Sequence, residues 1–245
     1  MTLLLSALIA CIPAASTVQM TGTVYDAPNA SGSVVGGVDV KALDSSGAVV
    51  DEQTSDDGGA FAVTITAGDG FFIETDGPAG QGYVPTAFSG TAGLVDFDAG
   101  VGFPWIASPD WFSTLQSQWV GCPGADTAGT AGSGVALTGE IRLYMNISDI
   151  NEMPISTGAT VRVTPAIGSE VEACYHDDSG VYAGAATGTG ADGQFAVFGA
   201  AAGGLAVSVE YTDTSETRRV VIYQYTAEDG GLVPILPTFV YDGGS

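Results

Sequence analysis

The stretch Gly37-Val38-Asp39-Val40-Lys41-Ala42 returns later in the chain as Gly158-Ala159-Thr160-Val161-Arg162-Val163. In both copies apolar and polar residues alternate, which is typical of a β-strand with one buried face. The alternation places Lys41 and Asp39 together on the exposed side of the first strand. Because internal repeats indicate architecture before any single motif does, the sequence predicts two similar units.

The segments on either side of these stretches repeat as well. Thr21-Gly22-Thr23-Val24 precedes the first stretch, and Thr138-Gly139-Glu140-Ile141 precedes the second. An Asp-Gly turn followed by Phe comes after each, at Asp57–Phe61 and at Asp192–Phe195. Asp-Gly steps supply the positive φ that tight turns between strands require. The second unit is longer around Ala173–Ala186, where we expect an inserted hairpin.

This order of motifs resembles the carboxypeptidase regulatory-like family of transthyretin-like β-sandwiches, over roughly 20–76 and 138–211. The resemblance implies a seven-stranded, prealbumin-like sandwich of the kind often repeated in surface proteins or appended to peptidases. It implies no catalytic residues. The fold class we predict is all-β: two tandem Greek-key β-sandwiches joined by a short helix-containing linker. The expected division is 1–17 signal peptide and tether, 18–100 first sandwich, 101–134 helix and linker, and 135–245 second sandwich.

Composition agrees with a packed β protein and narrows the partners. A hydrophobic fraction of 45% is ample for a core, and 36 Gly favour strands with tight turns over helices. The net charge of −23 repels phosphate backbones. Nucleic acid is therefore excluded as an expected partner.

The amino terminus indicates export and lipidation. Leu3–Ala10 is too short an apolar run to span a bilayer but is typical of a signal-peptide core. Leu8-Ile9-Ala10-Cys11 resembles a bacterial lipobox, which implies that Cys11 is acylated and holds the mature chain on a membrane. Ile12 rather than Asp after Cys11 permits outer-membrane delivery by the same resemblance. No Lys or Arg precedes Leu3, so the alternatives are a misassigned start codon or an apolar terminus with a chance Cys.

If Cys11 carries lipid, two thiols remain, Cys122 and Cys174. In an oxidising compartment such a pair usually forms a disulfide. The alternative is two unrelated buried thiols.

All three tryptophans, Trp105, Trp111 and Trp119, fall in one short segment. Ser108-Pro109-Asp110 is typical of a helix start and Gly121 of its end, which predicts a helix of about 11 residues. Trp111 and Trp119 lie on one face of it. This face would either plug a sandwich edge or the interface between the two domains, or present an aromatic platform to sugar rings or a partner protein. The Gly-rich stretch 121–134 is predicted to be a flexible linker.

Little in the sequence suggests catalysis. His176 is the single histidine, which excludes sites built from several histidines, and we expect it in a solvated loop. Asp56-Asp57 and Asp177-Asp178 would offer oxygen ligands to Ca²⁺, or simply form turns, since they lack the spacing of a calcium loop. No other cofactor is expected.

The leading functional hypothesis is a non-catalytic, exported surface lipoprotein that acts as a spacer or protein-interaction module. It would contact the membrane through its lipid and a protein or glycan at the cell surface. Two alternatives stay open: a carbohydrate-binding module that uses Trp105–Trp119, and an accessory domain of a secreted peptidase.

Overall fold

The structure is a computed structural model that describes residues 16–28, 31–100, 103–144, 156–177, 179, 181–184, 186–213 and 215–241. The elements of the first half are β1 (Thr17–Thr23), β2 (Asp39–Asp44), β3 (Val49–Thr54), β4 (Ala60–Thr66), β5 (Gly70–Asp76), β6 (Thr86–Thr91), β7 (Phe97–Asp98) and α1 (Pro109–Gln118). Those of the second half are β8 (Val135–Tyr144), β9 (Thr160–Pro165), β10 (Val171–Glu172), β11 (Cys174–His176), β12 (Tyr182–Ala183), β13 (Gln194–Ala200), β14 (Gly203–Thr212), β15 (Arg218–Ala227) and β16 (Leu232–Tyr241).

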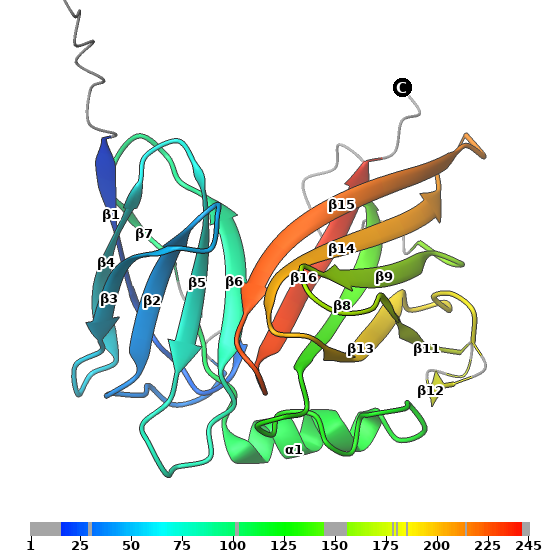
Figure 1. The fold of residues 1–245 in the computed structure, drawn as a ribbon, viewed down its shortest axis with the longest axis horizontal. Coiled ribbons are helices and arrows are strands. Elements are labelled where there is room, and N and C mark those ends of the chain that lie inside the picture. Colours follow the sequence, from blue (N-terminus) through cyan, green and yellow to red (C-terminus); the bar gives the residue numbers. More distant parts are fainter. Residues whose placement is uncertain are drawn as a thin grey trace, which may run out of the picture.

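The first unit, β1–β7, is a sandwich of two sheets (Figure 1). One sheet has the order β3-β2-β5-β6 and the other β4-β1-β7. β1 runs antiparallel to β4, from Thr17 opposite Thr66 to Thr23 opposite Ala60, and parallel to β7. Alternate residues of these strands, among them Val18, Met20, Val63 and Ile73, are buried between the two sheets.

The second unit, β8–β16, repeats every pairing of the first. β8 pairs with β13 and in parallel with β16, as β1 pairs with β4 and β7. β9 lies between β10 and β14, and β14 pairs with β15, as β2 lies between β3 and β5 and β5 pairs with β6. β11 and β12 form the extra hairpin at the edge of β13. The predicted duplication of an all-β sandwich is confirmed.

The two units share a β-sheet in addition to the segment of chain that connects them. β16 pairs with β8 on one side and with β6 of the first unit on the other, through Leu232 opposite Thr86. One sheet of nine strands therefore runs through both units, in the order β12-β11-β13-β8-β16-β6-β5-β2-β3. β16 has ten residues where its counterpart β7 has two, so it reaches the open edge of β6.

The long sheet is covered on opposite faces in its two halves. Ile73 and Phe88, which pair across β5 and β6, share one face, and Glu74 and Ala87 share the other. Ile73 belongs to the core under β4-β1-β7, whereas Ala87 belongs to the core under β9, β14 and β15. The second unit thus packs partly on the face of the β3-β2-β5-β6 sheet that the β4-β1-β7 sheet does not cover.

The helix and the Gly-rich stretch form the third layer, below both units in Figure 1. α1 begins after the N-cap Ser108, whose hydroxyl accepts the Trp111 N–H at 3.4 Å, and ends at Gln118, which confirms the predicted helix. The expectation of a flexible linker after it is wrong. Residues 119–133 form successive turns whose N–H groups bond three residues back, and these turns bury Cys122, Ala125 and Ala128.

Candidate functional site

The most elaborate site is the cap, by which we mean α1 together with residues 119–128. Its buried face contacts both units, because Val84 and Phe88 of the first and Ala196 and Phe198 of the second lie in the same apolar cluster. Phe112 and Trp119 reach this cluster from the cap itself. The cap therefore bridges the units on the face opposite β14 and β15.

The tryptophans hold the cap on the sheet. Trp105 and Trp119 are 1% and 0% exposed, and Trp111 is half-buried with its ring centroid 4.9 Å from that of Trp105. Trp119 packs edge-on against Phe198, with ring centroids 4.9 Å apart. Sugar rings stack on exposed aromatic faces, so the hypothesis of an aromatic platform at Trp105 and Trp119 needs correction. Their burial supports the alternative of a helix that plugs the junction.

The segment that carries Trp105 is also fixed by buried hydroxyls. The Trp105 carbonyl accepts hydrogen bonds from Thr86 and, at 3.3 Å, from Thr75, and the two hydroxyls lie 2.7 Å apart. Both threonines are at most 1% exposed. Buried polar groups with partners of this kind fix one arrangement of the chain.

A disulfide closes the far end of the cap. Cys122 and Cys174 are bonded, with Cα atoms 5.9 Å apart, which confirms the predicted pair. Cys174 lies in β11, so the bond ties the cap to the extra hairpin of the second unit.

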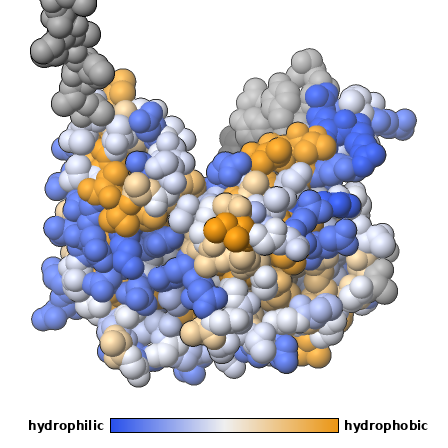
Figure 2. Space-filling view, in the orientation of Figure 1, coloured by the Kyte–Doolittle hydropathy of each residue, from blue (hydrophilic) through white to orange (hydrophobic). Residues whose placement is uncertain are grey.

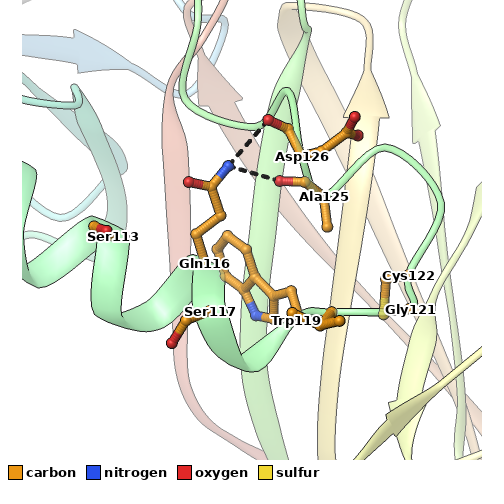
Figure 3. A pocket seen from close by; sticks show the side chains of 9 residues that line it. Ser113, Gln116, Ser117, Trp119, Gly121, Cys122, Ala125 and Asp126 are labelled. Atoms are coloured by element: carbon orange, nitrogen blue, oxygen red, sulfur yellow. Dashed lines mark hydrogen bonds between the residues drawn. The ribbon is translucent and has the colours of Figure 1, made fainter.

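An open groove of about 490 Å³ lies between the end of α1 and the turns that follow (Figure 3). Gln116 spans it and donates from its amide nitrogen to the carbonyls of Ala125 and Asp126, at 2.8 and 3.3 Å. Ser113, Ser117 and Val120 complete the wall. The groove offers hydroxyls and backbone groups, and its one aromatic residue, Trp119, is buried.

The acidic turns use their oxygens within the chain. Oδ1 of Asp56 accepts the N–H groups of Gly58 and Ala60, at 2.9 and 2.8 Å, while Asp57 is exposed. Oδ1 of Asp177 accepts the hydroxyl and N–H of Ser179, and these bonds lower the pKa of Asp177. Asp178 lies outside the described residues. Within the described chain, no three His, Cys, Asp or Glu side chains are grouped to hold a metal ion.

His176 is not the solvated loop residue that we expected. It lies in β11 with 15% of its side chain exposed, and its Nδ1 is 2.5 Å from Oδ2 of Asp192. Its ring packs edge-on against Tyr182, with centroids 4.0 Å apart. Asp192 belongs to the Asp-Gly turn before β13, so the pair fixes this turn beside the extra hairpin.

A second polar site, which the sequence did not predict, is the seam, where the β15–β16 turn lies against β5 and β6 of the first unit. Tyr225 of β15 packs toward Ser89 of β6. Glu74 of β5 is 9% exposed, and Lys41 is half-buried rather than exposed as predicted, because the second unit covers this face. Alternation correctly groups the residues of one face, yet it carries no signal of what lies over them.

Cys11 lies outside the described residues, so lipidation stays a prediction. Among the residues that are described, no helix is long and apolar enough to cross a membrane.

Comparison with solved structures returns β-rich pilins of Gram-positive bacteria. The shaft pilin SpaA of Lactobacillus rhamnosus GG has 11% identity over 94% of this chain and 98% of its own, with a TM-score of 0.27. A minor pilin of Streptococcus agalactiae has 12% identity over 94% and 97%, with a TM-score of 0.29. The major pilin subunit of Bacillus cereus has 8% identity over 94% and 99%, also with a TM-score of 0.29.

No protein-family model matches the chain, and no curated protein matches it in sequence. The β-sandwich class is thus established by the strand pairings themselves, while the resemblance to the carboxypeptidase regulatory-like family remains a prediction.

Proposed function

We propose that this protein is a non-catalytic, rigid two-unit spacer that is exported and held on a membrane by Cys11. The observation that carries the proposal is the nine-stranded sheet, which passes from one unit into the other through β16 and β6. A chain of independent modules needs no shared sheet, whereas a spacer that keeps a fixed length and direction does.

Three separate contacts support the rigid arrangement. The shared sheet joins the strands, the cap packs on both units, and the seam covers the open face of β5 and β6. Inter-domain contacts in one chain commonly permit movement unless they are large and apolar. Here the cap cluster alone buries residues from both units and from α1.

The direction of the spacer follows from where the strands begin and end. β1 starts at Thr17 at the end of the molecule opposite α1, and β16 also finishes at that end (Figure 1). Thr17 is the sixth residue after Cys11, a span of at most about 20 Å. An anchor at Cys11 would therefore keep this end near the membrane and turn the cap outward, where its groove would face partners.

Anchoring is tested by the intact mass of the protein from its native host, with and without globomycin. We expect a diacylglyceryl group at Cys11, and C11S should be released from the membrane fraction with the fold unchanged. An unmodified Cys11 in the native host would remove the anchor from the proposal.

Rigidity is tested by distance distributions between spin labels at Q53C and S169C, one exposed site in each unit. We expect a single narrow distribution, unchanged by viscosity or temperature below unfolding. A broad or multiple distribution would show that the units move independently.

The alternative of an accessory domain for a secreted peptidase is separated by a different measurement. A pull-down with the purified protein should then recover a peptidase from the culture supernatant. S117R and V120R in the cap groove should abolish this binding.

A further inference from the structure

The floor of the seam is a row of side chains that crosses four strands. Lys41 of β2 lies opposite Glu52 of β3 on one side and Glu74 of β5 on the other. Glu74 in turn lies opposite Ala87 of β6, which belongs to the core of the second unit. Neighbours of this kind in a sheet stand close enough to interact through their side chains.

The second unit brings another carboxyl group within electrostatic range of Glu74 and Lys41. Glu228 lies in the turn between β15 and β16, and its Oε1 is buried without a hydrogen-bond partner. The turn is held firmly, because the Asp229 carboxylate accepts the N–H groups of Gly132 and Gly134 and Leu232 donates to the Pro85 carbonyl at 2.8 Å.

A second close approach of the two units lies two residues before Glu228. An added Cβ at Gly47, in the β2–β3 turn, would lie 3.3 Å from Oγ1 of Thr226. The turn that carries Glu228 therefore has little freedom to withdraw while the units stay docked.

The charges of the seam do not balance. Lys41 is the single lysine of the chain, and it faces Glu52 and Glu74 from its own sheet and Glu228 from the other unit. Asp76 at the end of β5 adds a further negative charge near Glu228. Tyr225 also lies in the seam, and Tyr223 lies beside it in the groove between β15 and β5–β6; burial raises the pKa of Tyr223 to about 12, so it stays neutral.

We propose that Glu74, Glu228 and Lys41 form a proton-operated latch, in which protonation of one carboxyl group tightens the docking of the two units and ionisation of both loosens it. The proposal deepens the spacer function and rests on it, since a latch of this kind sets how stiff the spacer is.

The pKa shifts of the two carboxyl groups support the proposed direction, in which docking weakens as pH rises. Burial raises the pKa of Glu74, the charge of Glu228 raises it further, and Lys41 opposes both. Burial likewise raises the pKa of Glu228, with Lys41 opposing and Asp76 adding to the rise. A carboxyl group whose pKa is raised by docking stabilises the docked state at low pH, and this contribution is lost as pH rises through the raised pKa. The window therefore begins near the ordinary Glu value of about 4.3 and extends upward.

Figure 2 shows the surface hollowed between the units at the end opposite α1. A groove of about 370 Å³ already separates Phe72 and Ser89 of the first unit from Ile222 and Tyr223 of β15. Loosening of the latch would widen this groove on the β15 side.

The test compares the wild type with E74Q, E228Q and the double variant between pH 4.5 and 8. The control E172Q removes a carboxylate whose side chain is 74% exposed. Hydrogen exchange of the Leu232 amide, which donates to the Pro85 carbonyl of the first unit, reports local opening. The spin-label pair Q53C and S169C reports the distance between units.

We expect the exchange rate of this amide, divided by its intrinsic rate, to rise with pH by about tenfold for each unit by which docking raises a carboxyl pKa. Either Gln variant should reduce this rise, the double variant should remove it, and K41M should enlarge it. E172Q should behave as the wild type. A pH dependence that survives in the double variant would overturn the latch.

The two proposals fail differently. Broad label distances in every variant at every pH would refute the rigid spacer itself. Narrow distances with identical exchange in wild type and double variant would refute the latch alone.

Discussion

Leu232 of β16 lies opposite Thr86 of β6, and this parallel pair is where the sheet of the second unit becomes the sheet of the first. Leu232 is fully buried and its N–H donates to the Pro85 carbonyl at 2.8 Å. Its side chain enters the cap cluster with Phe88 and Trp105. A single residue thus contacts the shared sheet, the first unit and the cap.

Truncation of this side chain should destabilise both units together. L232A is expected to lower the free energy of unfolding by about 2–5 kcal/mol, because it leaves a cavity in a packed cluster. L94A, at a leucine that is 80% exposed, is the matched control and should change it by less than about 0.5 kcal/mol. Chemical denaturation followed by circular dichroism measures both. Equal effects of the two substitutions would contradict the role of Leu232.

Loss of the disulfide should loosen the cap. Cys122 and Cys174 are 52 residues apart, and closing such a loop stabilises a fold by about 4 kcal/mol on the chain-entropy estimate. C122S/C174S should therefore melt about 10 °C lower. Reductant should lower the melting temperature of the wild type and leave that of the double variant unchanged. A wild type insensitive to full reduction would show that the bond adds nothing.

The β14–β15 hairpin should respond to acid through Asp213. Its buried carboxylate accepts the hydroxyl and N–H of Ser215, the Thr217 N–H, and Arg219 Nε. The Ser215 hydroxyl first, and Arg219 also, hold the pKa of Asp213 well below its usual range.

A lowered pKa stabilises the fold above the unfolded value near 3.9 and ceases to do so as pH falls below it. D213N should lower the melting temperature at pH 7 and flatten its decline in acid. D57N, at an exposed aspartate, serves as the control in melts from pH 2 to 7. Parallel acid profiles of D213N and the wild type would argue against this role.

Trp119 should contribute to stability and not to ligand binding. W119A is expected to cost about 3–5 kcal/mol of unfolding free energy, since the indole is fully buried against Phe112 and Phe198. V120A, at a neighbour that is 73% exposed, should have little effect. Equilibrium unfolding measures both variants, and a glycan array with the wild type checks the second half of the prediction. Glycan binding lost in W119A at a temperature where it stays folded would restore the aromatic platform.

Much of this arrangement is visible in the sequence because it is local. The alternating apolar residues predict β2 and β9, the Asp-Gly turns predict the starts of β4 and β13, and Ser108-Pro109 predicts the start of α1. The cysteine pair follows from their number and from the expected compartment. Each of these inferences uses residues within one or two elements, where spacing decides which side chains share a face.

The candidate sites are less predictable. The tryptophan stripe predicted an apolar face, but an apolar face does not say whether a sheet or solvent lies against it. The same ambiguity misplaced Lys41, and the Gly-rich stretch looked flexible because small residues suit a linker and a close-packed turn alike. Cys122, Ala125 and Ala128 are buried at every third position of that stretch, a spacing that the turns themselves create.

The amino-acid sequence by itself determined the duplicated strands, their buried faces, the helix and the cysteine pair, since short-range periodicity and turn chemistry dictate these. Only the tertiary structure decided that β16 continues the sheet of the first unit, that the units cover opposite faces of it, and that Glu228 comes within electrostatic range of Glu74. Such pairings join residues far apart in the chain, and any open edge or apolar face of suitable shape can satisfy them, so their choice depends on how the whole molecule packs.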